Sequence, residues 1–153
     1  MSLAGNAPSL SCHPAATTAM VLKAQMSDLP TILIAEDDAL LRELLEHKLA
    51  IWGYRVLSAP DGEAAYELIR EQRPSMALLD VMMPRLDGFA LLRKMNQDGA
   101  LAHTRVIMIT GRTLEADVVN AFRWGVEDYV RKPFSLSELQ SRIARIVSPP
   151  ERA

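Results

Sequence analysis

Five short apolar runs, separated by longer amphipathic segments, organise the chain between residues 31 and 147. The runs are almost continuously apolar, without alternation between apolar and polar positions, which is typical of strands buried on both faces of a parallel sheet. They cover residues 31–35, 54–58, 76–80, 105–110 and 126–130. The last run, VEDYV, is the most polar and is expected at an edge of the sheet.

The segments between the runs repeat their inward positions every three or four residues, which predicts helices. These cover residues 39–52, 62–72, 88–97 and 114–124, and a final helix opens at Ser135. Glycines at 53 and 125 end the first and the fourth. The residues expected to face the core are, helix by helix, Leu41, Leu44, Leu45, Lys48 and Trp52; Ala64, Ala65, Leu68 and Ile69; Phe89, Leu91, Leu92 and Met95; Val118, Val119 and Phe122; and Leu139, Ile143 and Ile146.

Side chains that cap helices stand at the expected helix starts. Asp38, Asp61 and Asp87 precede the first three helices, and Ser135 with Glu138 has the spacing of a capping box. Five strands alternating with five helices predict a doubly wound α/β domain, a (βα)5 three-layer sandwich with a parallel five-stranded sheet.

The two ends differ from this domain of residues 31–147. Residues 1–30 carry only the charges of Lys23 and Asp28 and show no period, so we expect a disordered or weakly ordered extension. Met26 offers an alternative start, so the preceding residues are either an early start or added sequence. Residues 148–153 are expected to be a tail or a truncated linker after the last helix.

The overall composition excludes several classes of protein. Lysine and arginine number 17 and aspartate and glutamate 19, a net charge of −2, which argues against nucleic-acid binding by this chain. No apolar run is long enough to span a membrane. The single cysteine, Cys12, excludes an internal disulfide and fits a reducing, cytoplasmic setting.

Polar side chains fall where the predicted strands end, which is where doubly wound sheets bind ligands. Glu36 and Asp37 follow the first strand, Asp80 ends the third, Thr110 ends the fourth, and Lys132 lies just beyond the fifth. Clustered carboxylates repel one another unless a cation is bound, and Mg²⁺ prefers oxygen ligands. An aspartate beside Mg²⁺, a lysine and a hydroxyl predicts a phosphoryl-accepting site.

These residues stand in segments that resemble the response-regulator receiver domain, the phosphoacceptor of bacterial two-component signalling. The matching segments are ILIAEDD (32–38), LLDVMMPRLDG (78–88), IMITG (107–111) and DYVRKPF (128–134). Thr110 and Lys132 follow Asp80 by 30 and 52 residues, as is typical of the family. The resemblance implies a flavodoxin-like sheet of strand order 2-1-3-4-5.

The resemblance also implies a set of residue roles. Asp80 is expected to be the phosphorylated residue, with Mg²⁺ (or Mn²⁺) held by Asp37, Asp80, the backbone carbonyl of Met82 and, through water, Glu36. Thr110 and Lys132 are expected to contact the phosphoryl oxygens. The Lys132–Pro133 peptide is expected to be cis and to aim the lysine into the site.

Tyr129 matches the family's aromatic switch, which turns inward when Thr110 is drawn to the phosphoryl group. This movement would change the face formed by helix 114–124, strand 126–130 and the last helix. Met82 and Arg112 match positions that tune the lifetime of the acyl phosphate. Because Met82 cannot orient an attacking water, slow dephosphorylation is expected.

The expected partners are a histidine kinase or histidine phosphotransfer protein, and a second copy of this chain through the switch face. Asp38, Leu41 and Pro133 are weak candidates for contacts with the kinase. Asp128 and Arg142 match one ion pair of the dimer formed by winged-helix regulators. The arginine that would pair with Glu138 is replaced by Val118.

Two alternatives belong to other classes. One is a phosphorylation-independent interaction module with the same fold, against which the intact set of Asp37, Asp80, Thr110 and Lys132 argues. The other is a haloacid-dehalogenase-type hydrolase, which needs a second aspartate where this chain has Met82. The favoured interpretation is a signalling switch that catalyses only its own phosphorylation and dephosphorylation and is not a turnover enzyme.

Overall fold

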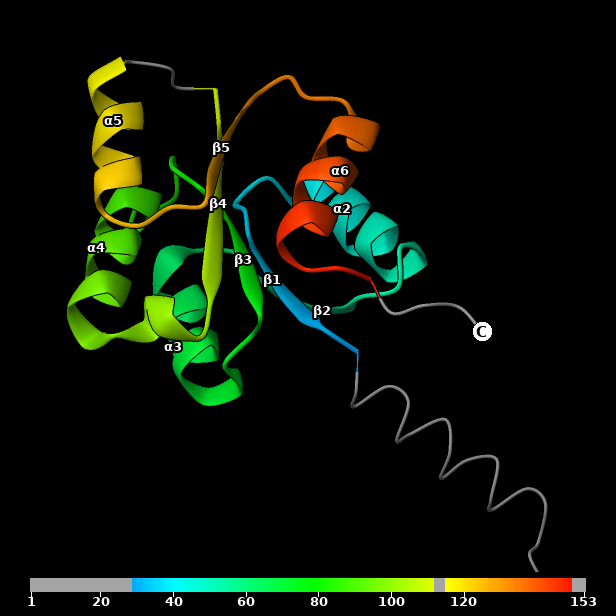
Figure 1. Ribbon diagram of the computed structural model, residues 1–153, viewed down its shortest axis with the longest axis horizontal. Helices are drawn as coiled ribbons and strands as arrows, with labels where there is room; N and C mark the ends of the chain where they lie inside the picture. Colours follow the sequence, from blue (N-terminus) through cyan, green and yellow to red (C-terminus); the bar gives the residue numbers. More distant parts are fainter. Residues whose placement is uncertain (1–28, 112–114, 150–153) are drawn as a thin grey trace, which may run out of the picture.

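A five-stranded parallel sheet with helices on both faces forms the domain in the computed structural model, which describes residues 29–111 and 115–149 (Figure 1). The strands lie in the order β2-β1-β3-β4-β5, and all four neighbouring pairs are parallel. Their bounds are β1 (Thr31–Ala35), β2 (Arg55–Ala59), β3 (Met76–Asp80), β4 (Arg105–Thr110) and β5 (Asp128–Arg131). This confirms the predicted fold and strand order, with β5 at an edge.

All five predicted helices are present, and four of them begin beside the predicted cap. The helices are α2 (Ala39–Ile51), α3 (Gly62–Gln72), α4 (Gly88–Asp98), α5 (Glu115–Arg123) and α6 (Leu136–Ile146), with a short 3₁₀ helix η1 (Ala100–Ala102) that was not predicted. Asp38, Asp61, Asp87 and Ser135 each accept a backbone N–H of the following turn. The predicted extension up to residue 28, Arg112 and the tail from residue 150 lie outside the described residues.

The sheet separates two apolar cores because alternate strand residues point to opposite faces. Ile32 and Ile34 of β1 pack with α2 and α6, whereas Leu33 and Ala35 pack with α3, α4 and α5. Figure 1 shows the same division, with α2 and α6 together on one side of the sheet. Every residue of β3 is buried, as expected for the central strand.

The core-facing residues predicted for two helices are partly wrong. In α2 the fully buried residues are Leu45 and Leu49, while Leu44 is 42% exposed. In α5 the side chains of Val119 and Phe122 are 53% and 48% exposed, and Ala121 is buried instead. The small alanine lets α5 pack closely, but it contributes little to an apolar pattern, so the pattern favours its bulkier neighbours.

Two strands are displaced from their predicted positions. The second begins at Arg55 instead of residue 54, and the fifth covers Asp128–Arg131 instead of 126–130. Tyr54 is still buried, because its ring packs in the core beside α2 and α6 and its hydroxyl donates to the Val147 carbonyl over 2.7 Å. Helices α2 and α5 end before Gly53 and Gly125, whose φ values of 100° and 104° suit glycine.

None of the helices among residues 29–111 and 115–149 is long and apolar enough to cross a membrane.

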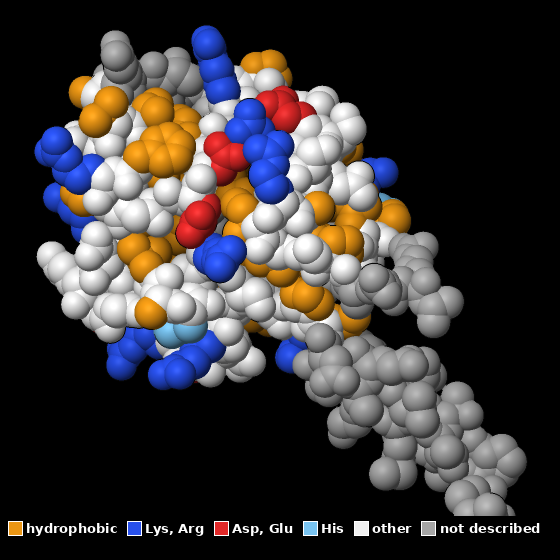
Figure 2. Space-filling model, viewed as in Figure 1, with side chains coloured by type: hydrophobic (Ala, Val, Ile, Leu, Met, Phe, Trp, Pro, Cys, Tyr) orange, Lys and Arg blue, Asp and Glu red, His pale blue; other side chains and the backbone are white. Residues whose placement is uncertain are grey.

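Figure 2 shows acidic and basic side chains side by side in the centre of the viewed face, over β5 and α6. Arg142 of α6 accounts for two ion pairs in this region, to Asp128 at 2.6 Å and to Glu138 at 3.0 Å. Arg142 therefore pairs with both acidic residues within one chain.

Candidate functional site

The carboxyl ends of four neighbouring strands bring the predicted site residues to one edge of the sheet. Asp80 ends β3 and Thr110 ends β4, while Glu36 and Lys132 follow β1 and β5 directly. The register places Ala35 beside Leu79 and Asp80 beside Ile109, so these ends are level across the sheet. The strand order β1-β3-β4-β5 therefore gathers residues that are far apart in the sequence.

Three carboxylates form a compact acidic cluster at this edge. One oxygen each from Glu36, Asp37 and Asp80 lies within 4.8 Å of the others. Glu36 and Asp80 are 3% and 5% exposed, whereas Asp37 is exposed to solvent. Two of the three negative charges are thus largely removed from water, which is unfavourable without a compensating cation.

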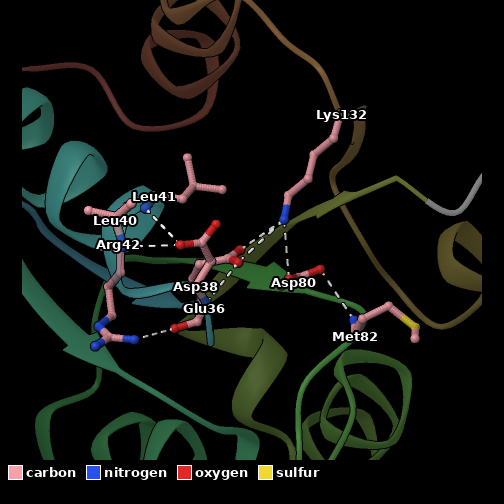
Figure 3. A network of polar contacts seen from close by, with 8 residues as sticks. All are labelled: Glu36, Asp38, Leu40, Leu41, Arg42, Asp80, Met82 and Lys132. Atoms are coloured by element: carbon pink, nitrogen blue, oxygen red, sulfur yellow. Dashed lines mark hydrogen bonds and ion pairs between the residues drawn. The ribbon is translucent and has the colours of Figure 1, made fainter.

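Lys132 supplies one compensating charge. Its Nζ donates to Glu36 Oε2 at 3.1 Å and to Asp80 Oδ2 at 3.2 Å, and Figure 3 shows it bridging the two carboxylates. The Lys132–Pro133 peptide is cis, as the sequence predicts. One ammonium facing three carboxylates leaves a surplus of negative charge.

The protonation equilibria reflect this surplus. The pKa of Glu36 is raised to about 7, because burial and the nearby Asp80 carboxylate raise it more than Lys132 lowers it. Burial lowers the pKa of Lys132, but Asp80 and Glu36 outweigh it, so the pKa lies above its usual value. Near neutral pH the lysine is therefore charged while Glu36 holds a proton for part of the time.

The loop after β3 is shaped around Asp80. The Met82 N–H donates to Asp80 Oδ1 at 3.2 Å, and the Gly88 N–H donates to the Val81 carbonyl at 3.0 Å. A Cβ at Gly88 would lie 2.4 Å from the Asp80 carbonyl oxygen, so α4 can begin there only with glycine. Close packing of α4 on the end of β3 fixes the backbone that carries Asp80.

A depression of about 520 Å³ opens over the acidic cluster. It is lined by Asp80, Met82, Thr110, Gly111 and Lys132. Thr110 is fully buried, whereas the Met82 side chain is 61% exposed. A small anionic group at this position would have a hydroxyl and an ammonium within its surroundings and a carboxylate at its base.

The predicted switch residues lie on neighbouring strands. Thr110 ends β4, and Tyr129 of β5 pairs in register with Met108 two residues earlier. Tyr129 is partly buried and packs against the core formed with α3, α4 and α5. Arg112, the other predicted lifetime residue, lies outside the described residues.

The donor set fits a hard divalent cation. All three carboxylates offer oxygen ligands within a few ångströms of one another, and the described residues place no cysteine or histidine in this cluster. Mg²⁺ prefers such ligands and commonly keeps water or phosphate oxygens in its remaining positions.

One residue at the site was not selected from the sequence. Arg42 of α2 donates from Nη1 to the Glu36 carbonyl oxygen at 2.7 Å. An arginine in the first turns of an amphipathic helix usually indicates a solvated face, so its position alone gave no signal. Only its location four residues after the capping Asp38 would have suggested contact with the acidic loop, residues 36–38 between β1 and α2.

Comparisons with known proteins identify relatives of this chain. The family description "Response regulator receiver domain" matches residues 32–144. A probable transcriptional regulator ycf27 of Galdieria sulphuraria is 40% identical over 112 residues, which is 73% of this chain and 43% of that protein. The transcriptional regulatory protein AfsQ1 of Streptomyces coelicolor is 39% identical over 124 residues, 81% of this chain and 54% of that protein.

Solved receiver domains have the same architecture. The receiver domain of the Francisella response regulator 1452 aligns with a TM-score of 0.72 and 30% identity, covering 76% of this chain and 95% of that one. The receiver domain of the Pseudomonas aeruginosa sensor kinase PA1611, solved with magnesium in its active-site cleft, aligns at 0.69 with 32% identity and covers 76% and 96% of the two chains.

The curated relatives extend beyond the matched region, since this chain spans about half of their length. The family match nevertheless covers all but the first residue of the five strands and almost all of the five helices described above. The chain belongs to the response regulator receiver domain family.

Proposed function

We propose that this chain is the phosphoacceptor of a two-component system, with Asp80 as the residue that receives the phosphoryl group. The observation that carries the proposal is the Lys132 ammonium shared between Asp80 and Glu36, at the rim where Asp37 and Thr110 also lie. An interaction module that had lost the chemistry would have no need for two largely buried carboxylates at this rim.

The reaction is a displacement at phosphorus. A carboxylate oxygen of Asp80 attacks the phosphoryl group of a phosphohistidine, a new O–P bond forms, and the P–N bond breaks with its electron pair returning to the imidazole. Lys132 moves with the product to pair with a phosphoryl oxygen, and the Thr110 hydroxyl donates to another. The donor is a histidine kinase or a histidine phosphotransfer protein.

Mg²⁺ (or Mn²⁺), when bound, would neutralise charge on the phosphoryl oxygens and on the acidic cluster. The residues that would hold it are Asp37, Asp80, the Met82 carbonyl and, through water, Glu36. Hydrolysis of the acyl phosphate is expected to be slow, because the Met82 side chain at the mouth cannot orient water. Arg112 is the second residue expected to tune this lifetime.

The phosphorylated state is proposed to act through Thr110 and Tyr129. As Thr110 is drawn toward the phosphoryl group, the partly buried Tyr129 ring turns further inward and changes the face formed by α5, β5 and α6. The chain is thus a cytoplasmic switch without a turnover substrate. Binding of nucleic acid would belong to segments outside this chain.

Intact mass after incubation with acetyl phosphate tests the proposal directly. We expect one phosphoryl increment on the wild type in the presence of Mg²⁺, and none after chelation. Asp80→Asn abolishes the increment because the nucleophile is lost. Asp87→Asn is the matched control, because asparagine keeps the cap of α4 and Asp87 lies outside the cluster.

A folded wild type that gains no phosphoryl group, and that also fails to bind beryllofluoride, would favour the interaction module. Labelling that persists in Asp80→Asn would mean that another residue is the acceptor.

A further inference from the structure

Arg42 is hydrogen-bonded to the backbone of the acidic loop on the side that faces away from Lys132. Its Nη1 donates to the Glu36 carbonyl oxygen at 2.7 Å, a short, charge-assisted hydrogen bond in a partly buried setting. Figure 3 shows the guanidinium on the side of the loop opposite to Lys132. Arg42 therefore contacts the loop without entering the space between the carboxylates.

The carbonyl that Arg42 holds belongs to the peptide unit joining Glu36 to Asp37. Because this unit is planar, fixing its oxygen also fixes its N–H and the direction in which the Asp37 Cα follows. Asp37 is the exposed carboxylate of the cluster, and it lies between Glu36 and Asp38, whose side chains both accept backbone N–H groups. The orientation of its side chain thus depends on the peptide that Arg42 holds.

Other contacts secure the two ends of this loop. The Glu36 N–H donates to the Ala59 carbonyl at 3.2 Å, and Asp38 Oδ1 accepts the Leu40 N–H at 3.0 Å. The Arg42 side chain joins these ends, because its own backbone N–H donates to the Asp38 carbonyl at 2.9 Å while its guanidinium reaches Glu36. The first turn of α2 and the end of β1 are thereby locked together.

Arg42 pairs with no carboxylate among residues 29–111 and 115–149, despite the acidic residues nearby. Its charge is directed at a carbonyl instead. A positive charge behind the cluster weakens the attraction of the carboxylates for a divalent cation, so charge alone would disfavour an arginine here. Any favourable effect of Arg42 on cation binding must therefore come from the geometry that it gives to the loop.

We propose that Arg42 is a positioning residue for the magnesium site, which orients Asp37 through the Glu36–Asp37 peptide. The inference rests on the proposed function. It predicts a change in Mg²⁺ affinity opposite to the one that simple electrostatics predicts, because removing the positive charge of Arg42 lowers the affinity. We expect a decrease of at most about tenfold, because the loss of one charge-assisted hydrogen bond sets the upper limit of the effect.

Calorimetric titration of the full chain with Mg²⁺ separates the two effects. Arg42→Met removes charge and donor while keeping a long side chain, and Arg42→Lys keeps the charge without the guanidinium fork. We expect weaker binding in both, and circular dichroism checks that both are folded. Arg145→Met, on the exposed last turn of α6, is the matched control and should bind as the wild type does.

An unchanged or higher Mg²⁺ affinity in Arg42→Met, with normal binding by the wild type, overturns the role of Arg42 alone. A wild type that neither binds Mg²⁺ nor accepts a phosphoryl group overturns the proposed function as well. Hydrogen exchange in the metal-free proteins gives a second readout. The Asp37 and Asp38 amides should exchange faster in Arg42→Met, and unchanged exchange there would contradict the positioning role.

Discussion

Glu36 is the residue at which burial and charge oppose each other most strongly. Its side chain is almost inaccessible to solvent and faces another carboxylate, while Lys132 compensates part of its charge, and together these place its pKa at about 7. The unfolded chain would ionise this group near the ordinary value of 4.5. Between these two values the folded protein binds a proton that the unfolded chain releases.

This difference sets a pH dependence of stability in the metal-free protein. Because the native state holds more protons between pH 4.5 and 7, its free energy of unfolding decreases as the pH rises through this window. We expect a contribution of about 1–3 kcal/mol, since one pKa unit corresponds to about 1.4 kcal/mol. Glu36→Gln should flatten the profile.

Urea denaturation in EDTA at several pH values between 5 and 8 measures this effect. Glu43→Gln, an exposed position on α2, is the control and should retain the wild-type slope. Equal slopes in the wild type and in Glu36→Gln would show that another group causes the pH dependence.

At this scale the sequence predicts which residues meet but not their energetics. Asp80, Glu36, Asp37, Thr110 and Lys132 could be placed together because each ends or follows a strand, and strand ends are visible in the apolar pattern. The bond from Arg42 to the Glu36 carbonyl could not be predicted, since it depends on a side-chain rotamer and on a backbone oxygen. The unequal burial of Glu36 and Asp37 depends on the loop in the same way.

Among the elements, α5 contacts α4 through the aromatic residue that directly follows α5. Trp124, directly after α5, meets Phe89 edge to face with 6.0 Å between ring centroids, and the Arg93 guanidinium lies 5.3 Å from its centroid. Its carbonyl also accepts a hydrogen bond from the Asn96 side chain at 2.9 Å. Movement of α5 against α4 therefore changes the surroundings of this indole.

Trp124 should consequently report activation of the switch face. In a Trp52→Phe background, we expect beryllofluoride with Mg²⁺ to shift the Trp124 emission to longer wavelength, because displacement of α5 removes its contacts with Phe89 and Arg93. Fluorescence titration measures the shift, and Asp80→Asn should abolish it. A spectrum that stays constant while beryllofluoride binds would show that the end of α5 does not move.

The elements themselves were predicted well where apolar residues are large and numerous. The bounds of β1, β3, β4 and α3 agree with the predicted ranges, because their apolar runs are interrupted sharply by polar or turn residues. The inward face of α5 was wrong because Ala121, which gives almost no signal, is its buried residue. Strand β5 was placed too early because Val126 is buried but lies before the strand.

For the whole molecule, the apolar exposure of α5 and the charges of α6 together determine how two copies could meet. Val119 and Phe122 are about half exposed, while Asp128 and Glu138 are already paired with Arg142 in the same chain. An interface through this face would therefore depend on apolar contact more than on ion pairs between copies.

We expect the beryllofluoride-bound protein to form a dimer that Phe122→Arg abolishes, because a charge at that position cannot be buried unpaired. Light scattering after size exclusion gives the mass of each form. Leu40→Arg is the control, since this residue is exposed on α2, on the other side of the sheet. A monomeric activated wild type, or a dimer that survives Phe122→Arg, would rule out this interface.

The hydrogen bond from Tyr54 to the Val147 carbonyl has a consequence for how the domain communicates. Together with Arg105, which donates to the Ile146 carbonyl at 3.3 Å, it fastens the end of α6 beside the amino ends of the strands. Asp80 lies at the opposite end of the sheet, and α6 spans about 16 Å between the two ends. We therefore expect polypeptide that continues past Val147 to leave from a clamped point, so that a rearrangement near Asp80 would reach it as a tilt of α6 about that point and not as a release of the chain.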